Sequence, residues 1–64
     1  MKVRDVLRTI EADGWVLDRT RCSHRQYKHA SRPGVVTVPG KPGDDLPYGT
    51  LKSIWKQAGI EDLR

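Results

Sequence analysis

The hydrophobic pattern predicts a helix near the start of the chain. Between residues 2 and 13 the apolar side chains recur at the spacing that lines one side of a helix, at Val3, Val6, Leu7 and Ile10. Gly14 follows, as a glycine commonly does just past a helix end. Trp15 is then placed to pack back on Ile10, the apolar contact that accompanies such an ending.

A second helix is predicted near the end of the chain. Its apolar residues have the same spacing, at Leu51, Ile54, Trp55 and Ala58. Gly59 would end it, with Ile60 packing back on Trp55. Asp44 and Asp45 lie just before this helix, where negative charge stabilises a helix start. Residues 61–64 would form a tail or one further turn.

Three short segments between the helices have the composition of strands. Residues 15–20, 23–30 and 35–38 are rich in bulky or β-branched side chains, or alternate in character. The sequence between the first two allows a tight hairpin. Residues 31–34 (Ser-Arg-Pro-Gly) suit a type II turn, with proline at its second position and glycine at its third. The three strands would form an antiparallel meander.

The predicted order α-β-β-β-α describes an α+β fold in one domain, residues 1–64, with both helices on one face of the sheet. The other face, called the open face below, would be left to solvent. On the second strand, the alternation of side chains places His24, Gln26 and Lys28 on the open face and Tyr27 toward the core. The first strand is ambiguous, because the adjacent Val16 and Leu17 point to opposite faces.

Composition limits what so small a protein can do. The chain has 64 residues, of which 36% are hydrophobic, enough for one core and too few to enclose a substrate cavity. Catalysis would therefore take place on an open surface. Cys22 is the only cysteine, so no internal disulfide can form. The start of the chain is charged, and no apolar run is long enough to cross a membrane, which favours a cytoplasmic protein.

The positive charge is concentrated in one segment. The net charge is +4, but residues 19–32 contain no acidic residue and five basic ones, namely Arg19, Arg21, Arg25, Lys28 and Arg32. Such a run is often only a solvated surface. If it has a function, its natural partner is a polyanion, most commonly a phosphate backbone.

Several short motifs, in this order and at this spacing, resemble one bacterial family. They are Asp-Gly-Trp-Val at 13–16, Ser-His-Arg-Gln-Tyr-Lys-His at 23–29, Pro-Gly at 33–34, Leu-Pro-Tyr-Gly-Thr-Leu at 46–51 and Lys-Gln-Ala-Gly-Ile at 56–60. Together they resemble the HicA toxins of type II toxin–antitoxin systems, small endoribonucleases that cleave mRNA. The order of elements is also that of the double-stranded-RNA-binding domain.

The resemblance implies a catalytic residue, a substrate and a partner. In the family a histidine that follows a Gly-Ser pair on the second strand is catalytic, and here it is His24. The substrate would be mRNA, and a HicB-type antitoxin would bind the toxin and block its active site. Cys22 stands where the family has glycine, and a cysteine would be expected to need an ordinary backbone conformation.

The chemistry of RNA cleavage fits these residues. RNA carries its own nucleophile, the 2′-OH, so cleavage needs a proton acceptor, a proton donor and positive charge near the phosphate, and in principle neither metal nor cofactor. His24 could accept or donate the proton. The candidate RNA-binding residues are Arg21, Ser23, Gln26 and Lys28. Lys28 lies four residues from His24, about 13 Å along a strand, so the two would flank one RNA strand.

The remaining titratable residues favour simpler interpretations. His29 would point to the face opposite His24, as a partly buried histidine beside Tyr27, so catalysis would depend on one histidine and be slow. Cys22 and His24 alone do not make a zinc site. Two rival functions share the basic segment: a non-catalytic RNA-binding module of the same fold, and a small protein that binds an acidic protein.

Overall fold

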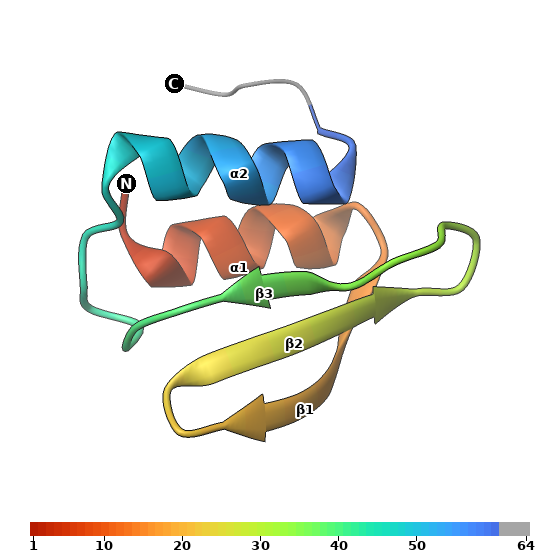
Figure 1. Ribbon diagram of the computed structural model, residues 1–64, viewed down its shortest axis with the longest axis horizontal. Helices are drawn as coiled ribbons and strands as arrows, with labels where there is room; N and C mark the ends of the chain where they lie inside the picture. The colour runs from red at the N-terminus through yellow and green to blue at the C-terminus, as the bar shows by residue number, and fades with distance from the viewer. Residues whose placement is uncertain (61–64) are drawn as a thin grey trace.

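The computed structural model describes residues 1–60 and confirms the predicted order of elements (Figure 1). These are α1 (Val3–Ala12), β1 (Trp15–Arg21), β2 (His24–His29), β3 (Val36–Val38) and α2 (Tyr48–Ala58). The strands form one antiparallel sheet in the order β1-β2-β3, so the fold is α+β as expected. The predicted tail or turn at 61–64 lies outside the described residues.

Several boundaries differ by one residue from the predicted ones. Lys2 is extended, with φ −74° and ψ 147°, so α1 begins one residue later. β1 continues to Arg21, because its pairing with β2 runs up to the loop formed by Cys22 and Ser23. β2 is correspondingly one residue shorter at each end than predicted. Val35 is exposed and precedes β3.

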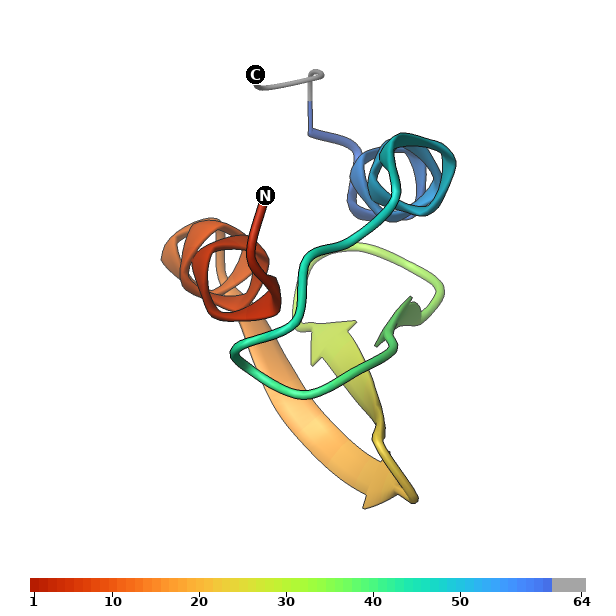
Figure 2. The same ribbon diagram turned by 90° about the vertical axis from the view of Figure 1, so that its left-hand side faces the viewer.

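Both helices lie on the same side of the sheet, as Figures 1 and 2 show. The core fills the space between the two layers and contains Val3, Val6, Ile10, Trp15, Tyr27, Val36, Val38, Leu46, Leu51, Ile54, Trp55 and Ala58. Leu7 and Ile60 pack against it from its margin. Within the described chain, no helix covers the other face of the sheet. The predicted two-layer arrangement is therefore present, and it leaves the open face accessible.

Glycine is required at the junction between α1 and β1. Gly14 has φ +101°, a conformation that side chains rarely adopt. A Cβ atom at this position would also lie 2.6 Å from Nε2 of His29. The end of α1 can therefore approach the end of β2 closely only because residue 14 has no side chain.

Asp44 and Asp45 lie before the start of α2, as predicted, but neither side chain caps the helix. Pro47 occupies the N-cap position of α2, and no side chain caps the helix. Asp44 accepts a hydrogen bond from the backbone N–H of Lys41 instead, at 3.0 Å. Asp45 forms an ion pair with Lys2 at 3.3 Å. The carboxylate of Asp44 thus acts within the loop before α2, and that of Asp45 joins this loop to Lys2, just before α1.

Candidate nucleic-acid interface

Three pairs of opposed residues on β1 and β2 lie on the open face. Directly paired residues of an antiparallel sheet lie on the same face. The register therefore places the β2 residues His24, Gln26 and Lys28 beside their β1 partners, in the pairs Arg21–His24, Arg19–Gln26 and Val16–Lys28. The open face therefore carries Arg19 and Arg21 of β1 in addition to the three residues predicted on β2.

A β-bulge decides which side chains of β1 reach this face. The pairing shifts between Leu17 and Arg19, so Asp18 has no direct partner. Leu17 pairs with Tyr27 and lies on the helix side of the sheet, while Val16 lies on the open face. Beyond the bulge the alternation is reversed, which turns Arg19 to the open face. The ambiguity of the first strand is thereby resolved.

His24 stands at the end of this face that is closest to the hairpin loop. It is the first residue of β2, is exposed, and is paired with Arg21. Within the described chain, neither side chain has a hydrogen-bond or ion-pair partner. Ser23, in the loop just before His24, is exposed as well. The imidazole of His24 and the guanidinium of Arg21, which lie on neighbouring strands, are therefore both available to a ligand.

The hairpin loop corrects the expectation for Cys22. Its φ is +55°, so the cysteine adopts a left-handed conformation and not an ordinary one. Ser23 has a negative φ, and a positive φ at the first loop position alone is the pattern of a type II′ turn. Such turns match the twist of the paired strands. The hairpin therefore imposes the left-handed conformation on Cys22. For a residue with a Cβ this conformation is about 1–2 kcal/mol less favourable in free energy.

An acidic residue reduces the positive charge at the other end of the face. Asp18 Oδ2 lies 3.7 Å from Nζ of Lys28 and 3.5 Å from Nε of Arg19. In the sequence, Asp18 lies just before the acid-free segment 19–32. In the fold, its carboxylate lies beside two of the five basic residues of that segment, Arg19 and Lys28. Arg21 is therefore the cation beside His24 that no carboxylate offsets among the described residues.

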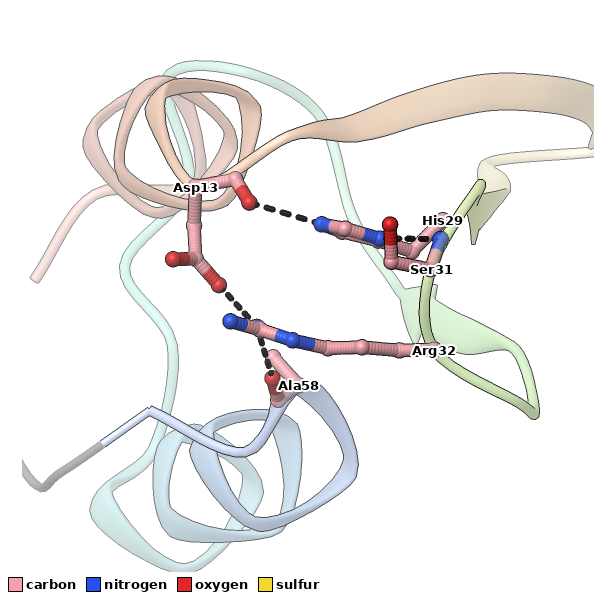
Figure 3. A network of polar contacts seen from close by, with 5 residues as sticks. All are labelled: Asp13, His29, Ser31, Arg32 and Ala58. Atoms are coloured by element: carbon pink, nitrogen blue, oxygen red, sulfur yellow. Dashed lines mark hydrogen bonds and ion pairs between the residues drawn. The ribbon is translucent and has the colours of Figure 1, made fainter.

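Two more of the five basic residues hold the fold together. Arg25 donates to the backbone oxygen of Gly40 at 2.9 Å. Arg32 forms an ion pair with Asp13 and donates to the backbone oxygen of Ala58 at 3.1 Å, which joins the C-terminal ends of α1 and α2 (Figure 3). Neither arginine belongs to the open face. The basic segment therefore divides into a structural part and a solvent-facing part.

Comparison with known families identifies the chain. The family model described as the HicA toxin of bacterial toxin–antitoxin matches residues 3–60. The chain belongs to the HicA toxin family. The resemblance found in the sequence is confirmed, and it makes the protein a toxin whose class implies an antitoxin partner. No match was found among curated proteins.

In this HicA-family toxin, His29 is a structural residue, as predicted. Its Nδ1 accepts a hydrogen bond from the backbone N–H of Ser31 at 3.0 Å, and its Nε2 lies 2.9 Å from the backbone oxygen of Asp13 (Figure 3). These contacts assign the neutral ring with its proton on Nε2. The ring also packs edge-on against Trp15, with centroids 5.2 Å apart. Trp15, and not the expected Tyr27, is its aromatic neighbour.

Tyr27 connects the sheet of the toxin to α1. Its side chain is buried, and its hydroxyl donates to Oε2 of Glu11 at 3.1 Å. Burial, reinforced by the hydrogen bond to Glu11 and the charge of that carboxylate, raises the pKa of Tyr27 to about 12. Arg25 acts weakly in the opposite direction. The phenol is therefore a packing element of the toxin and lies on the face opposite His24.

The described residues of the toxin contain neither a cluster of metal-binding side chains nor a membrane-spanning helix. Across residues 1–60, no three His, Cys, Asp or Glu side chains come together in a way that could hold a metal ion. No helix in that range is both long and apolar enough to cross a membrane. Cys22, the exposed free cysteine, lies two residues from His24 in the hairpin loop.

Two residues have roles that no local sequence pattern indicates. Asp18 was counted with the N-terminal part of the chain, although its bulge turns Arg19 outward and its carboxylate contacts Lys28. Arg32 was counted as a candidate solvent-facing cation, although it is bonded to both helices. A break in the apolar alternation after Leu17 was the only local signal for the bulge.

Proposed function

We propose that this toxin is an endoribonuclease that cleaves mRNA in the cytoplasm without a metal ion, with His24 as its general acid or base. The observation that carries this proposal is the pairing of His24 with Arg21 on the open face. Both side chains are exposed, and neither is bonded within the described residues. His24 also matches the catalytic position that the family resemblance implies.

The proposed reaction uses the nucleophile of RNA itself. The 2′-oxygen attacks the adjacent phosphorus while His24 accepts its proton, and the bond from phosphorus to the 5′-oxygen breaks. The departing 5′-oxygen takes up a proton from the imidazolium or from water. The products are a 2′,3′-cyclic phosphate and a 5′-hydroxyl. Arg21 would stabilise the negative charge that develops on the phosphate.

The other open-face residues would bind the RNA on either side of the reacting phosphate. Gln26 lies in the middle of the face and can hydrogen-bond to bases or riboses. Lys28 can contact a neighbouring phosphate, although Asp18 reduces its contribution. Ser23 can donate or accept a hydrogen bond beside His24. These residues would form a track along β2 for a single RNA strand.

An RNA with one 2′-deoxy nucleotide tests this reaction. The cleavage site is first mapped on an all-RNA substrate, and the nucleotide 5′ to it is then replaced by its 2′-deoxy form. We expect no cleavage at that bond, while neighbouring sites are still cut. Cleavage of the modified bond would exclude the 2′-OH mechanism. Binding of both RNAs without cleavage would support a non-catalytic RNA-binding module instead.

We further propose that a HicB-type antitoxin competes with RNA for the exposed basic residues. An anionic surface on the antitoxin would meet Arg19, Arg21 and Lys28 and cover His24. Because such charge pairs are exposed to solvent, salt should weaken the complex. The affinity is measured between 50 and 500 mM salt, and RNA is added as a competitor. An affinity that does not change with salt would contradict this mode of binding.

A further inference from the structure

The outer edge of β1 differs from the opposite edge of the sheet. β3 has three residues, and the backbone N–H of Thr37 donates to Oε1 of Gln57 on α2 at 3.2 Å. β1 has seven residues and is the outermost strand on the other side (Figure 1). Within the described chain, its residues make no backbone hydrogen bond outside the ladder with β2. One edge of the sheet is thus protected, and the longer one is open.

The direction of the backbone groups on β1 follows from the pattern at β3. The N–H of Thr37 points away from β2, toward Gln57, so Thr37 and Gln26 form a pair without mutual hydrogen bonds. Because such pairs alternate, the next residue, Arg25, directs its backbone groups toward β3 and away from β1. Thr20 is paired with Arg25. Its own N–H and C=O therefore point to the free edge.

Exposed apolar side chains flank this edge on both faces. Val16 on the open face is 66% exposed, and Leu17 on the helix side is 48% exposed. An added strand that continued past the bulge, alongside residues 16 and 17, would cover both. Long exposed edges of this kind are usually protected, because they can pair with another chain. Here the bulge at Asp18 is the only interruption, and it leaves a regular stretch at residues 19–21.

The free edge of β1 could pair with a second copy of this chain or with a segment of another protein, and the charge of the edge favours the second. A second copy of this chain would carry the same net charge of +4 and bring basic edge residues against one another. Arg21 has no carboxylate beside it among the described residues, and Arg19 is offset by Asp18 at 3.5 Å. The free charge of Arg21 instead favours a segment that carries carboxylates. The toxin class supplies a protein partner, the antitoxin.

We propose that the antitoxin adds an extended, carboxylate-bearing segment as a fourth strand on the free edge of β1. Paired strands lie about 4.8 Å apart, so its side chains on the open face would adjoin Arg19 and Arg21, two strand spacings from His24. The inference rests on the proposed function only for the role of His24. The edge pairing itself needs only the toxin and its antitoxin.

Hydrogen exchange of backbone amides tests the pairing on the unaltered proteins. The free toxin and its complex with the antitoxin are compared residue by residue. We expect the amide of Thr20 to exchange at least 100-fold more slowly in the complex. The amide of Thr37, which is already bonded to Gln57, serves as the internal control and should change much less. Unchanged exchange at Thr20 in a saturated complex would overturn the proposal.

The same measurement on the toxin alone tests whether a second copy of the toxin, and not the antitoxin, pairs with the edge of β1. Exchange at Thr20 and the sedimentation of the free toxin are followed over a range of concentrations. A monomer with fast exchange is expected. A dimer whose Thr20 amide becomes protected would overturn the proposal and show that a second copy occupies the edge.

A pair of substitutions at residue 20 provides a second test. Thr20→Pro removes the outward N–H, and proline is tolerated on an edge strand where that N–H faces solvent. Thr20→Val keeps the N–H and the β-branched shape. We expect Thr20→Pro to weaken antitoxin binding at least tenfold and Thr20→Val to leave it unchanged. Equal binding by two folded variants would contradict the proposal.

RNA cleavage separates this inference from the proposed function. A Thr20→Pro toxin that still cuts RNA but escapes the antitoxin would support both. If the wild-type toxin cuts no RNA while Thr20 is protected in the complex, the pairing stands and the nuclease proposal fails. If Thr20→Pro does not fold, the exchange measurement on the wild-type complex decides the matter alone.

Discussion

At the scale of single residues, Cys22 carries a backbone cost that a glycine would remove. The left-handed conformation costs a residue with a Cβ about 1–2 kcal/mol, part of which a glycine returns as greater freedom of the unfolded chain. Cys22→Gly should therefore raise the free energy of unfolding by about 1 kcal/mol. In a domain of this size, that corresponds to an increase in Tm of roughly 4–8 °C.

Cys22→Ala is the matched control, because alanine keeps the Cβ and removes the thiol. Its free energy of unfolding should stay within about 0.5 kcal/mol of the wild type. Urea unfolding of the three proteins gives the comparison. Equal stabilisation by alanine and glycine would show that the thiol, and not the backbone, is the source of the cost.

Tyr27 makes the stability of the toxin depend on pH in the alkaline range. Its pKa is raised from 10.0 to about 12 in the folded state, so between these values the unfolded chain has lost the proton and the folded protein retains it. The contribution of Tyr27 to the free energy of unfolding should therefore fall by at most about 1.4 kcal/mol per pH unit between pH 10 and 12. This contribution is fully present below pH 10.

Tyr27→Phe removes the ionisable group while it keeps the ring in the core. Urea unfolding at several pH values between 9 and 12 should show a shallower decline for the phenylalanine variant. At neutral pH the variant should lose about 1 kcal/mol, because the hydrogen bond to Glu11 is gone. An identical pH dependence in the two proteins would place the alkaline titration elsewhere.

At the scale of elements, the β1–β2 hairpin distributes its positive charges unequally. Arg21 is paired with His24 and has no carboxylate beside it in the described chain, whereas Lys28 lies near Asp18. Arg21→Ala should therefore lower kcat/KM for RNA cleavage by about 100-fold, the effect of removing a group that stabilises transition-state charge. Lys28→Ala should lower it less than tenfold, since exposed, compensated charges contribute little.

Steady-state kinetics on one RNA substrate measure both variants, with circular dichroism as the check on folding. Equal losses for Arg21→Ala and Lys28→Ala would contradict the different roles assigned to the two ends of the face. A larger loss for Lys28→Ala would move the reacting phosphate toward the far end of β2.

How far the sequence predicts each element depends on whether the signal is local. The two helices are predictable, because each has an apolar stripe and a terminal glycine. The open face of β2 is predictable as well, since its alternation is uninterrupted. β1 is not, because the bulge at Asp18 breaks the alternation that assigns side chains to faces. The roles of Arg25 and Arg32 depend on carbonyl groups distant in sequence, which no local pattern reveals.

At the scale of the whole molecule, the residues that stabilise the toxin and those proposed to act on RNA lie in different parts of the fold. The core and the network of Asp13, His29 and Arg32 lie on the helix side of the sheet and at its end. His24 and Arg21 project from the other face, where nothing in the described chain covers them. Substitutions at His24 should therefore leave folding intact and change only activity.

RNA cleavage by the wild type and by His24→Ala, in excess EDTA, shows whether His24 performs the chemistry and whether a metal ion is needed. Both proteins are first shown to be folded and to bind the same RNA. We expect the wild type to cut without metal and His24→Ala to be at least about 100-fold slower, the usual contribution of a general acid or base. Equal cutting by the two proteins would place the active site elsewhere. Loss of cutting by the wild type in EDTA would contradict the metal-independent mechanism.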